Sequence, residues 1–212
     1  MSEQREKTDD YDHHGGFPVY KAAEDGGGPD FGRLIEALRT VQDLAVSTAP
    51  PADVVKRAAD QAEALAALLE PHRVPEGAQI GGRCMNLPGR GSLLMLPWTI
   101  EKFDDTGVRS TGVFRRFHLG GNGAAHGGTL PLVFDDLFGM ITHAYGRPIS
   151  RTAYLHVNYR SVTPINRKLV IEGQVDRVEG RKTFVSARMV DENGVLVADC
   201  EALMLVLLPG QP

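Results

Sequence analysis

The chain has 212 residues, of which 42% are hydrophobic and 24% are charged, and its formal net charge is −4. This composition is ordinary for a soluble globular protein, and the length suits one substantial domain with an appendage. We expect no nucleic-acid partner, because such binders carry a basic stripe. We also expect no membrane span, because no apolar run approaches the roughly 20 residues that a transmembrane helix needs.

The N-terminal segment and the cysteines indicate in which cellular compartment the protein resides. The segment from Met1 to Lys7 is polar and lacks the apolar stretch of a signal peptide. Cys84 and Cys200 are the only cysteines, and their spacing fits neither a metal site nor a disulfide framework. We therefore predict a cytoplasmic protein with reduced thiols and without a metal or redox cofactor.

The N-terminal third divides into two regions. Residues 1–29 are charged and glycine-rich, which predicts a disordered tail. Its His14-Gly15-Gly16 triplet is interpreted as part of that tail, because no helical pattern with a carboxylate follows it. Residues 30–77 predict a helical extension: one helix over 30–47 with Asp30 as N-cap, and a second over 52–69 after two prolines.

Residues 78–212 predict one domain in which strands surround a helix. Two strands, 93–103 and 108–117, are joined by a hairpin turn. A helix then runs from near Gly127 or Gly128 to about Tyr145, and four strands follow over 152–162, 168–179, 183–191 and 195–208. The apolar series of the helix is Leu130, Val133, Phe134, Leu137, Phe138, Ile141 and Tyr145. This order predicts an α+β fold, an antiparallel sheet wrapped around a central helix.

Chemistry is indicated where this helix begins. His126-Gly127-Gly128 directly precedes it, and free N–H groups at a helix N-terminus favour a developing oxyanion. Asp135 lies about two turns further along, where an unpaired charge would be costly at a core position, and this favours a functional role. Asp136 follows it and competes for that role. An oxyanion site plus a carboxylate is the minimum equipment for acyl transfer.

These residues and the order of elements resemble the hotdog-fold thioesterases, and most closely the branch of phenylacetate-degradation thioesterases and thioesterase-superfamily members. The resemblance covers about residues 79–208. It departs at Gly120, where many relatives carry asparagine, so the role of the nearby Asn122 is open. Counting from Gly139-Met140 favours Asp135 over Asp136. The matching residues are Ala125-His126-Gly127-Gly128, Asp135, Gly139-Met140, Thr152-Ala153, Asn158-Tyr159 and Val178-Glu179-Gly180-Arg181-Lys182.

The resemblance implies an acyl-CoA thioesterase of fatty acid metabolism, which hydrolyses a thioester to a free acid and coenzyme A. It also implies a homodimer, or a dimer of dimers, in which one subunit's glycines and the other's aspartate share each site. Gly128 or Gly127 would supply the oxyanion N–H, Asp135 would be general base or nucleophile, and Thr152 would orient water or the aspartate. The substrate-binding candidates are Asn122, His126, Gly127, Arg181 and Lys182.

Simpler interpretations stand beside these. A glycine pair before a helix is often only a tight turn, and a packing role for His126 is as consistent as chemistry. Thr152 also suits a plain strand position, and Arg181-Lys182 suits a solvated turn. The alternative function is a hotdog module that binds an acyl-CoA without hydrolysing it, as a sensor or scaffold. A hotdog hydratase is disfavoured, because no second, histidine-based motif is present.

Overall fold

The structure, a computed structural model, describes residues 27–75 and 78–208. The predicted disordered tail, with its His14-Gly15-Gly16 triplet, lies outside the described residues except at positions 27–29. The division into a tail (1–29), a helical extension (30–77) and a domain (78–212) stays a prediction.

Helices and strands follow the predicted order, with one addition. The elements are α1 (Phe31–Ser47), α2 (Ala52–Leu69), β1 (Thr99–Asp104), β2 (Gly107–Val113), β3 (Leu119–Gly121), β4 (Ala124–Ala125), α3 (Thr129–Ala144), β5 (Ser150–Tyr159), β6 (Lys168–Glu179), β7 (Lys182–Asp191) and β8 (Leu196–Val206). Three short 3₁₀ helices, η1 (Glu70–His72), η2 (Pro88–Gly91) and η3 (Arg116–His118), lie in the connections. The short pair β3–β4 was not predicted.

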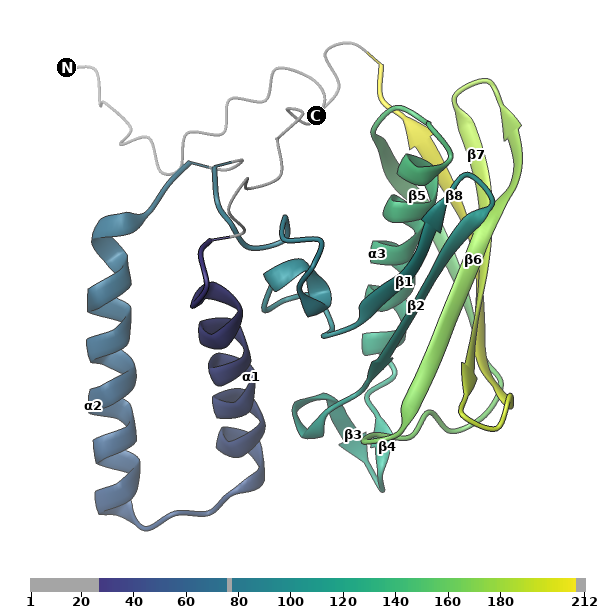
Figure 1. Ribbon diagram of the computed structural model, residues 1–212. Coiled ribbons are helices and arrows are strands. Elements are labelled where there is room, and N and C mark those ends of the chain that lie inside the picture. Colours follow the sequence, from purple (N-terminus) through teal and green to yellow (C-terminus); the bar gives the residue numbers. More distant parts are fainter. Residues whose placement is uncertain (1–26, 76–77, 209–212) are drawn as a thin grey trace, which may run out of the picture.

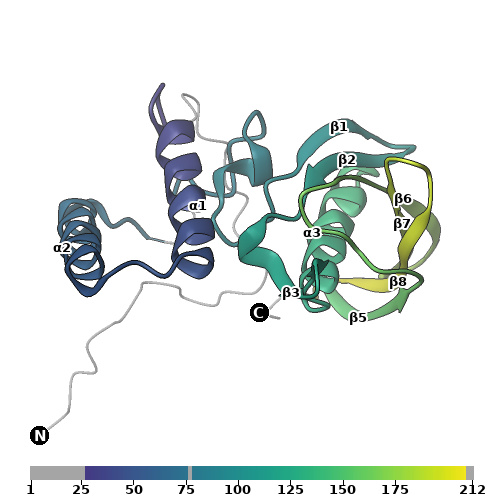
Figure 2. The same cartoon turned by 90° about the horizontal axis from the view of Figure 1, so that it is seen from below.

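The six long strands form one antiparallel sheet in the order β1-β2-β6-β7-β8-β5. The sheet curls around α3, which lies against its concave face (Figure 1), and the end-on view shows strands on several sides of the helix (Figure 2). The predicted α+β fold, a sheet wrapped around one central helix, is confirmed.

The apolar stripe of α3 forms the core. All the positions predicted for this stripe are buried except Tyr145, which is 46% exposed because α3 ends at Ala144 and Tyr145 is its C-cap. Thr142 is buried instead, and its hydroxyl donates to the carbonyls of Phe138 and Gly139. A Cβ on Gly173 of β6 would lie 2.8 Å from Ile141 Cδ1, so glycine at this position lets α3 approach the sheet closely.

The first two strands are shorter than predicted. β1 begins at Thr99 rather than Leu93, because the chain turns tightly around Pro97, where the Trp98 N–H donates to the Leu96 carbonyl at 2.7 Å. Leu94, predicted as a strand residue, is 69% exposed. β2 ends at Val113 rather than Phe117, because η3 follows with the Arg115 N–H donating to His118 Nδ1.

The N-terminal helices differ in how they attach to this domain. On α1, Arg39 is 5% exposed and donates to the carbonyls of Pro88 and Ser92. Asp43 of the same helix accepts from Arg115 next to η3. Asp30 occupies the N-cap position of α1, but its side chain makes no capping hydrogen bond. Helix α2 buries no residue and lies beyond α1, away from the sheet, in both views (Figures 1 and 2).

We predict that Arg39→Met weakens the attachment of α1. The substitution keeps an unbranched side chain but leaves two carbonyls without their charged donor, which costs about 1.5–3 kcal/mol of unfolding free energy. Urea unfolding measures the loss. Arg33→Met is the matched control, because Arg33 lies on the same helix with a side chain that is 79% exposed. Equal stability of the two variants would contradict the prediction.

Candidate functional site

The glycine-rich segment before α3 folds into a small hairpin. Asn122 and Gly123 form its tip with φ angles of 47° and 74°, a left-handed pair typical of such turns. The Ala125 N–H donates to the Thr163 carbonyl, which fixes the hairpin to the loop after β5. The predicted substrate-binding residue Asn122 is therefore exposed and shapes the backbone; a contact with substrate stays a prediction.

Residues 126–128, here called the glycine turn, lead into α3. The Gly128 N–H donates to His126 Nδ1 at 3.0 Å, and the N–H and hydroxyl of Thr129 both donate to the His126 carbonyl. His126 thus shapes the turn through its ring and its backbone. Within the described residues the Gly127 N–H has no partner. The geometry therefore favours Gly127 over Gly128 as the donor to an oxyanion.

Tyr159, at the end of β5, supports the glycine turn from outside. Its hydroxyl donates to the Gly127 carbonyl at 2.8 Å. Tyr159 belongs to the residues that carry the family resemblance, but no role in the site was predicted for it. Only the length and register of β5 bring this hydroxyl to the turn, so local sequence carries no signal for the contact.

Asp135 and Thr152 meet across α3 and β5. The Thr152 hydroxyl donates to Asp135 Oδ1 at 2.6 Å, and within the described residues it is the one hydrogen-bond partner of that carboxylate. Asp135 is exposed in this chain, so the expectation of a buried charge at this position is wrong for a single copy. It lines an open depression of about 260 Å³ together with Ser150, Arg151 and Met204.

A β-bulge decides which way Thr152 faces. The strand alternation predicts that Ala153 shares a face with Leu155 and Val157, which would turn Thr152 away from α3. In the structure the register shifts between Thr152 and Tyr154, Ala153 is exposed, and Thr152 lies opposite the buried Met204. The extra residue re-aims the threonine toward Asp135, as bulges often do beside functional sites.

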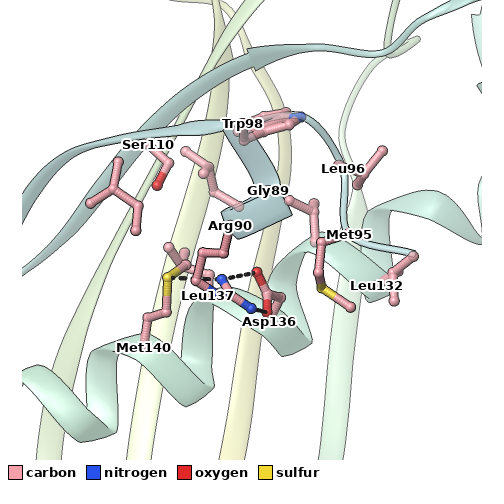
Figure 3. A pocket seen from close by; sticks show the side chains of 13 residues that line it. Gly89, Arg90, Met95, Leu96, Trp98, Ser110, Leu132, Asp136, Leu137 and Met140 are labelled. Carbon is pink, nitrogen blue, oxygen red and sulfur yellow. Dashed lines mark hydrogen bonds and ion pairs between the residues drawn. The ribbon is translucent and has the colours of Figure 1, made fainter. Parts of the chain in front are cut away.

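Asp136 is already paired. Arg90 of η2 donates from one amino group to Asp136 Oδ2 at 2.9 Å and from the other to Oδ1 at 2.5 Å. The side chains of Arg90 and Asp136 are only 18% and 20% exposed. Figure 3 shows this two-pronged contact of the guanidinium, here called the fork, beside α3. Burial alone would lower the pKa of Arg90, but the hydrogen bond and charge of Asp136 raise it. The competing carboxylate is thus engaged, which favours Asp135 for chemistry.

The remaining sequence candidates lie at the other end of the helix. Arg181 lies in the β6–β7 turn and Lys182 begins β7. Arg147, just beyond the C-terminus of α3, donates to the carbonyl of Gly180 in the same turn. The glycine turn precedes the N-terminus of α3 (Figure 1). One copy of the chain therefore does not bring Arg181 or Lys182 together with Gly127.

Neither a metal cluster nor a membrane helix occurs in the described part of the chain. Over residues 27–75 and 78–208, His, Cys, Asp and Glu side chains form no group of three that could hold a metal ion. In the same ranges no helix is both long enough and apolar enough to cross a bilayer. Cys84 and Cys200 are both buried thiols, and burial raises the pKa of the Cys200 thiol to about 12.

Comparison with known proteins shows which proteins this chain is similar to. Residues 122–198 match the family model described as thioesterase superfamily. The chain also resembles two proteins named acyl-coenzyme A thioesterase THEM4, at 34% identity over 98 residues for Mus musculus and 35% for Rattus norvegicus. Each match covers 45% of this chain and 41% of the relative, so the chain spans about two fifths of the curated relatives' length.

Solved structures agree on the fold. A crystal structure described as a thioesterase superfamily protein superposes with a TM-score of 0.74 at 25% identity, over 84% of this chain and 96% of that one. A hypothetical thioesterase from Streptococcus pneumoniae, solved with coenzyme A, has a TM-score of 0.50 at 22% identity, over 54% and 91% of the two chains. The sheet and α3 form a hotdog fold. Residues 122–198 of the domain that they build match the thioesterase superfamily model, and the solved structure with a TM-score of 0.74 carries the same description.

We predict that Tyr159→Phe loosens the glycine turn. Losing one neutral hydrogen bond costs about 0.5–1.5 kcal/mol, so the amides of Gly128 and Thr129 should exchange faster with solvent. Hydrogen exchange followed by NMR measures this. Tyr154→Phe is the control, because Tyr154 lies on the same strand and its hydroxyl has no partner within the described residues. Identical exchange in the two variants would refute the role of Tyr159.

Proposed function

We propose that the protein is an acyl-CoA thioesterase, which hydrolyses an acyl-CoA to a carboxylic acid and free coenzyme A. The observation that carries this is the Thr152–Asp135 hydrogen bond. It fixes a carboxylate that has no cationic partner among the described residues, in an open depression of a domain that matches the thioesterase superfamily over residues 122–198. The coenzyme A bound to the streptococcal protein and the names of the mammalian relatives support the substrate class.

The chemistry needs an acceptor for a proton and a donor for an oxyanion. In the proposed reaction Asp135 takes a proton from water, whose oxygen bonds to the thioester carbon. The carbonyl oxygen becomes an oxyanion, and the Gly127 N–H, with Gly128 as the second candidate, donates to it. The C–S bond then breaks, and the coenzyme A thiolate takes up the proton. Direct attack by the Asp135 carboxylate is the alternative first step.

One copy of the chain is insufficient for this reaction. Asp135 lies six residues beyond the first residue of α3, which places it about 9 Å further along the helix axis. A carbonyl bound at the glycine turn is therefore out of its reach. We propose a homodimer in which Asp135 of one copy faces the glycine turn of the other. β5 supports this arrangement, because it is an edge strand of ten residues that pairs with β8 alone among the described strands.

Several finer assignments belong to the same proposal. In the proposed dimer, Arg181 and Lys182 of the second copy contact the coenzyme A phosphates, and His126 and Asn122 shape the entrance. The cytoplasmic location and the dimer-of-dimers state stay predictions. The alternative, a module that binds an acyl-CoA without turnover, predicts binding with no thiol release from any member of a panel of acyl-CoAs.

We predict that Asp135→Asn lowers thiol release about 10²–10⁴-fold, the usual contribution of a general base. Asp136→Asn should lose far less, because that carboxylate is engaged by Arg90. The measurement is colorimetric thiol release from acyl-CoAs of several chain lengths, with circular dichroism confirming that both variants fold. Full activity of Asp135→Asn would overturn the assignment. Activity absent from the wild type on every acyl-CoA would favour the binding module.

Subunit mixing tests the shared site. Gly127→Pro deletes the oxyanion N–H, which has no partner within the described residues, so little structure should be lost. Gly127→Pro and Asp135→Asn should each be nearly inactive alone. After denaturation and co-refolding, random pairing should restore about a quarter of wild-type turnover, because half of the dimers hold one intact site in two. A mixture that stays inactive would place both groups in one subunit.

A further inference from the structure

The turn that carries Arg90 adopts an unusual backbone. Gly89, Arg90 and Gly91 have φ angles of 57°, 54° and 75°. Left-handed backbone is natural for the two glycines and rare for arginine. A Cβ on Gly89 would lie 2.6 Å from the Leu96 carbonyl oxygen, so the turn is pressed against the chain that leads into β1. Such conformations persist only where their surroundings enforce them, and they gather at functional sites.

Hydrogen bonds from two directions enforce this turn. The N–H groups of Gly82 and Cys84 both donate to the Arg90 carbonyl, and Arg90 Nε donates to the Gly82 carbonyl. From α1, the buried Arg39 donates to the carbonyls of Pro88 and Ser92 on either side. The left-handed turn is therefore a built feature of the segment that connects the N-terminal helices to the sheet.

This backbone aims Arg90 at one point on α3. Its guanidinium forks onto Asp136 and contacts Met140 Sδ at 3.3 Å. Figure 3 shows the fork at the wall of a small cavity of about 20 Å³ between α3 and the sheet. Its other walls include the apolar side chains of Leu96, Trp98 and Leu137. The pair is thus partly shielded from bulk water, which strengthens its electrostatic attraction.

We propose that Arg90 is a positioning residue for hydrolysis: it holds Asp136 in a bidentate ion pair and so leaves Asp135 as the single unpaired carboxylate at this point of α3. This inference rests on the proposed function. It also gives the segment between the N-terminal helices and β1 a part in the reaction, because Arg90 lies in η2, outside residues 122–198, which match the family model.

The groups around Asp135 explain why the charge of Asp136 affects the ionisation of Asp135. On α3 the adjacent charge is Asp136. β5 contributes the neutral Thr152 and the cationic Arg151, and β8 contributes the thiol of Cys200, which is neutral because burial raises its pKa to about 12. Without Arg90, Asp136 would be a second unpaired carboxylate, and like charges side by side make ionisation harder.

The test is the pH dependence of hydrolysis by the full chain. Arg90→Met should move the acidic limb of kcat/KM to higher pH by about half to one unit. Adding Asp136→Asn to Arg90→Met should return the limb to its wild-type position, because the unpaired charge is gone. Arg90→Lys should move the acidic limb less than Arg90→Met does, because the lysine keeps a positive charge beside Asp136. Arg109→Met is the matched control, because Arg109 pairs with Glu101 and Glu172 on β1 and β6, away from α3.

Two further measurements separate the possible failures. Arg90→Gly removes the same guanidinium and relieves the left-handed backbone, so it replaces Arg90→Met if that variant does not fold. The carboxyl ¹³C titration of Asp135 should shift in the same direction in Arg90→Met, and this readout needs no turnover. A shifted titration without hydrolysis would reject the proposed function alone. Hydrolysis with an unshifted limb and an unshifted titration in Arg90→Met would reject the role of Arg90.

Discussion

The burial of one face of α3 inside a curled sheet is the constraint on which the rest of this structure depends. Phe134, Phe138 and Ile141 are almost completely buried against strands that close around the helix, and Gly173 permits the close approach. Once that face is fixed, the direction of every other α3 side chain is fixed with it. Asp135 and Asp136 then lie at the margins of the buried stripe, and the glycine turn lies at the N-terminus of the same helix.

The two adjacent carboxylates receive different partners because they leave the helix in directions about 100° apart. Asp135 meets a neutral hydroxyl from β5, whereas Asp136 meets a shielded guanidinium from η2. A hydroxyl orients a carboxylate and leaves it free to accept a proton, whereas a forked ion pair consumes both oxygens. Two chemically identical side chains therefore differ in whether they can accept a proton. The difference comes from elements more than a dozen residues away in sequence on either side.

β5 ties the two halves of the candidate site together. It supplies Thr152 to the carboxylate near one end and Tyr159 to the glycine turn at the other. The same strand is an open edge of the sheet. A second copy docking there would contact the elements that position both groups, so assembly and chemistry would depend on one strand. The glycine turn and Asp135 lie apart along α3 within one chain. Docking of a second copy would bring the glycine turn of one copy to Asp135 of the other.

The sequence by itself determined most of the local elements and singled out the candidate site residues. Helix α2, strand β6 and the α3 stripe were predicted nearly to the residue, because periodicity, prolines and turn residues act over short range. Asp135 and the glycine turn were recognised from their spacing. Tertiary structure alone decided the bulge at Ala153, the Tyr159 contact, the engagement of the Gly128 N–H and the ion pair of Arg90. Each of these, apart from the Gly128 contact, joins residues far apart in sequence, and even that contact depends on a side-chain orientation that no pattern of residue types encodes.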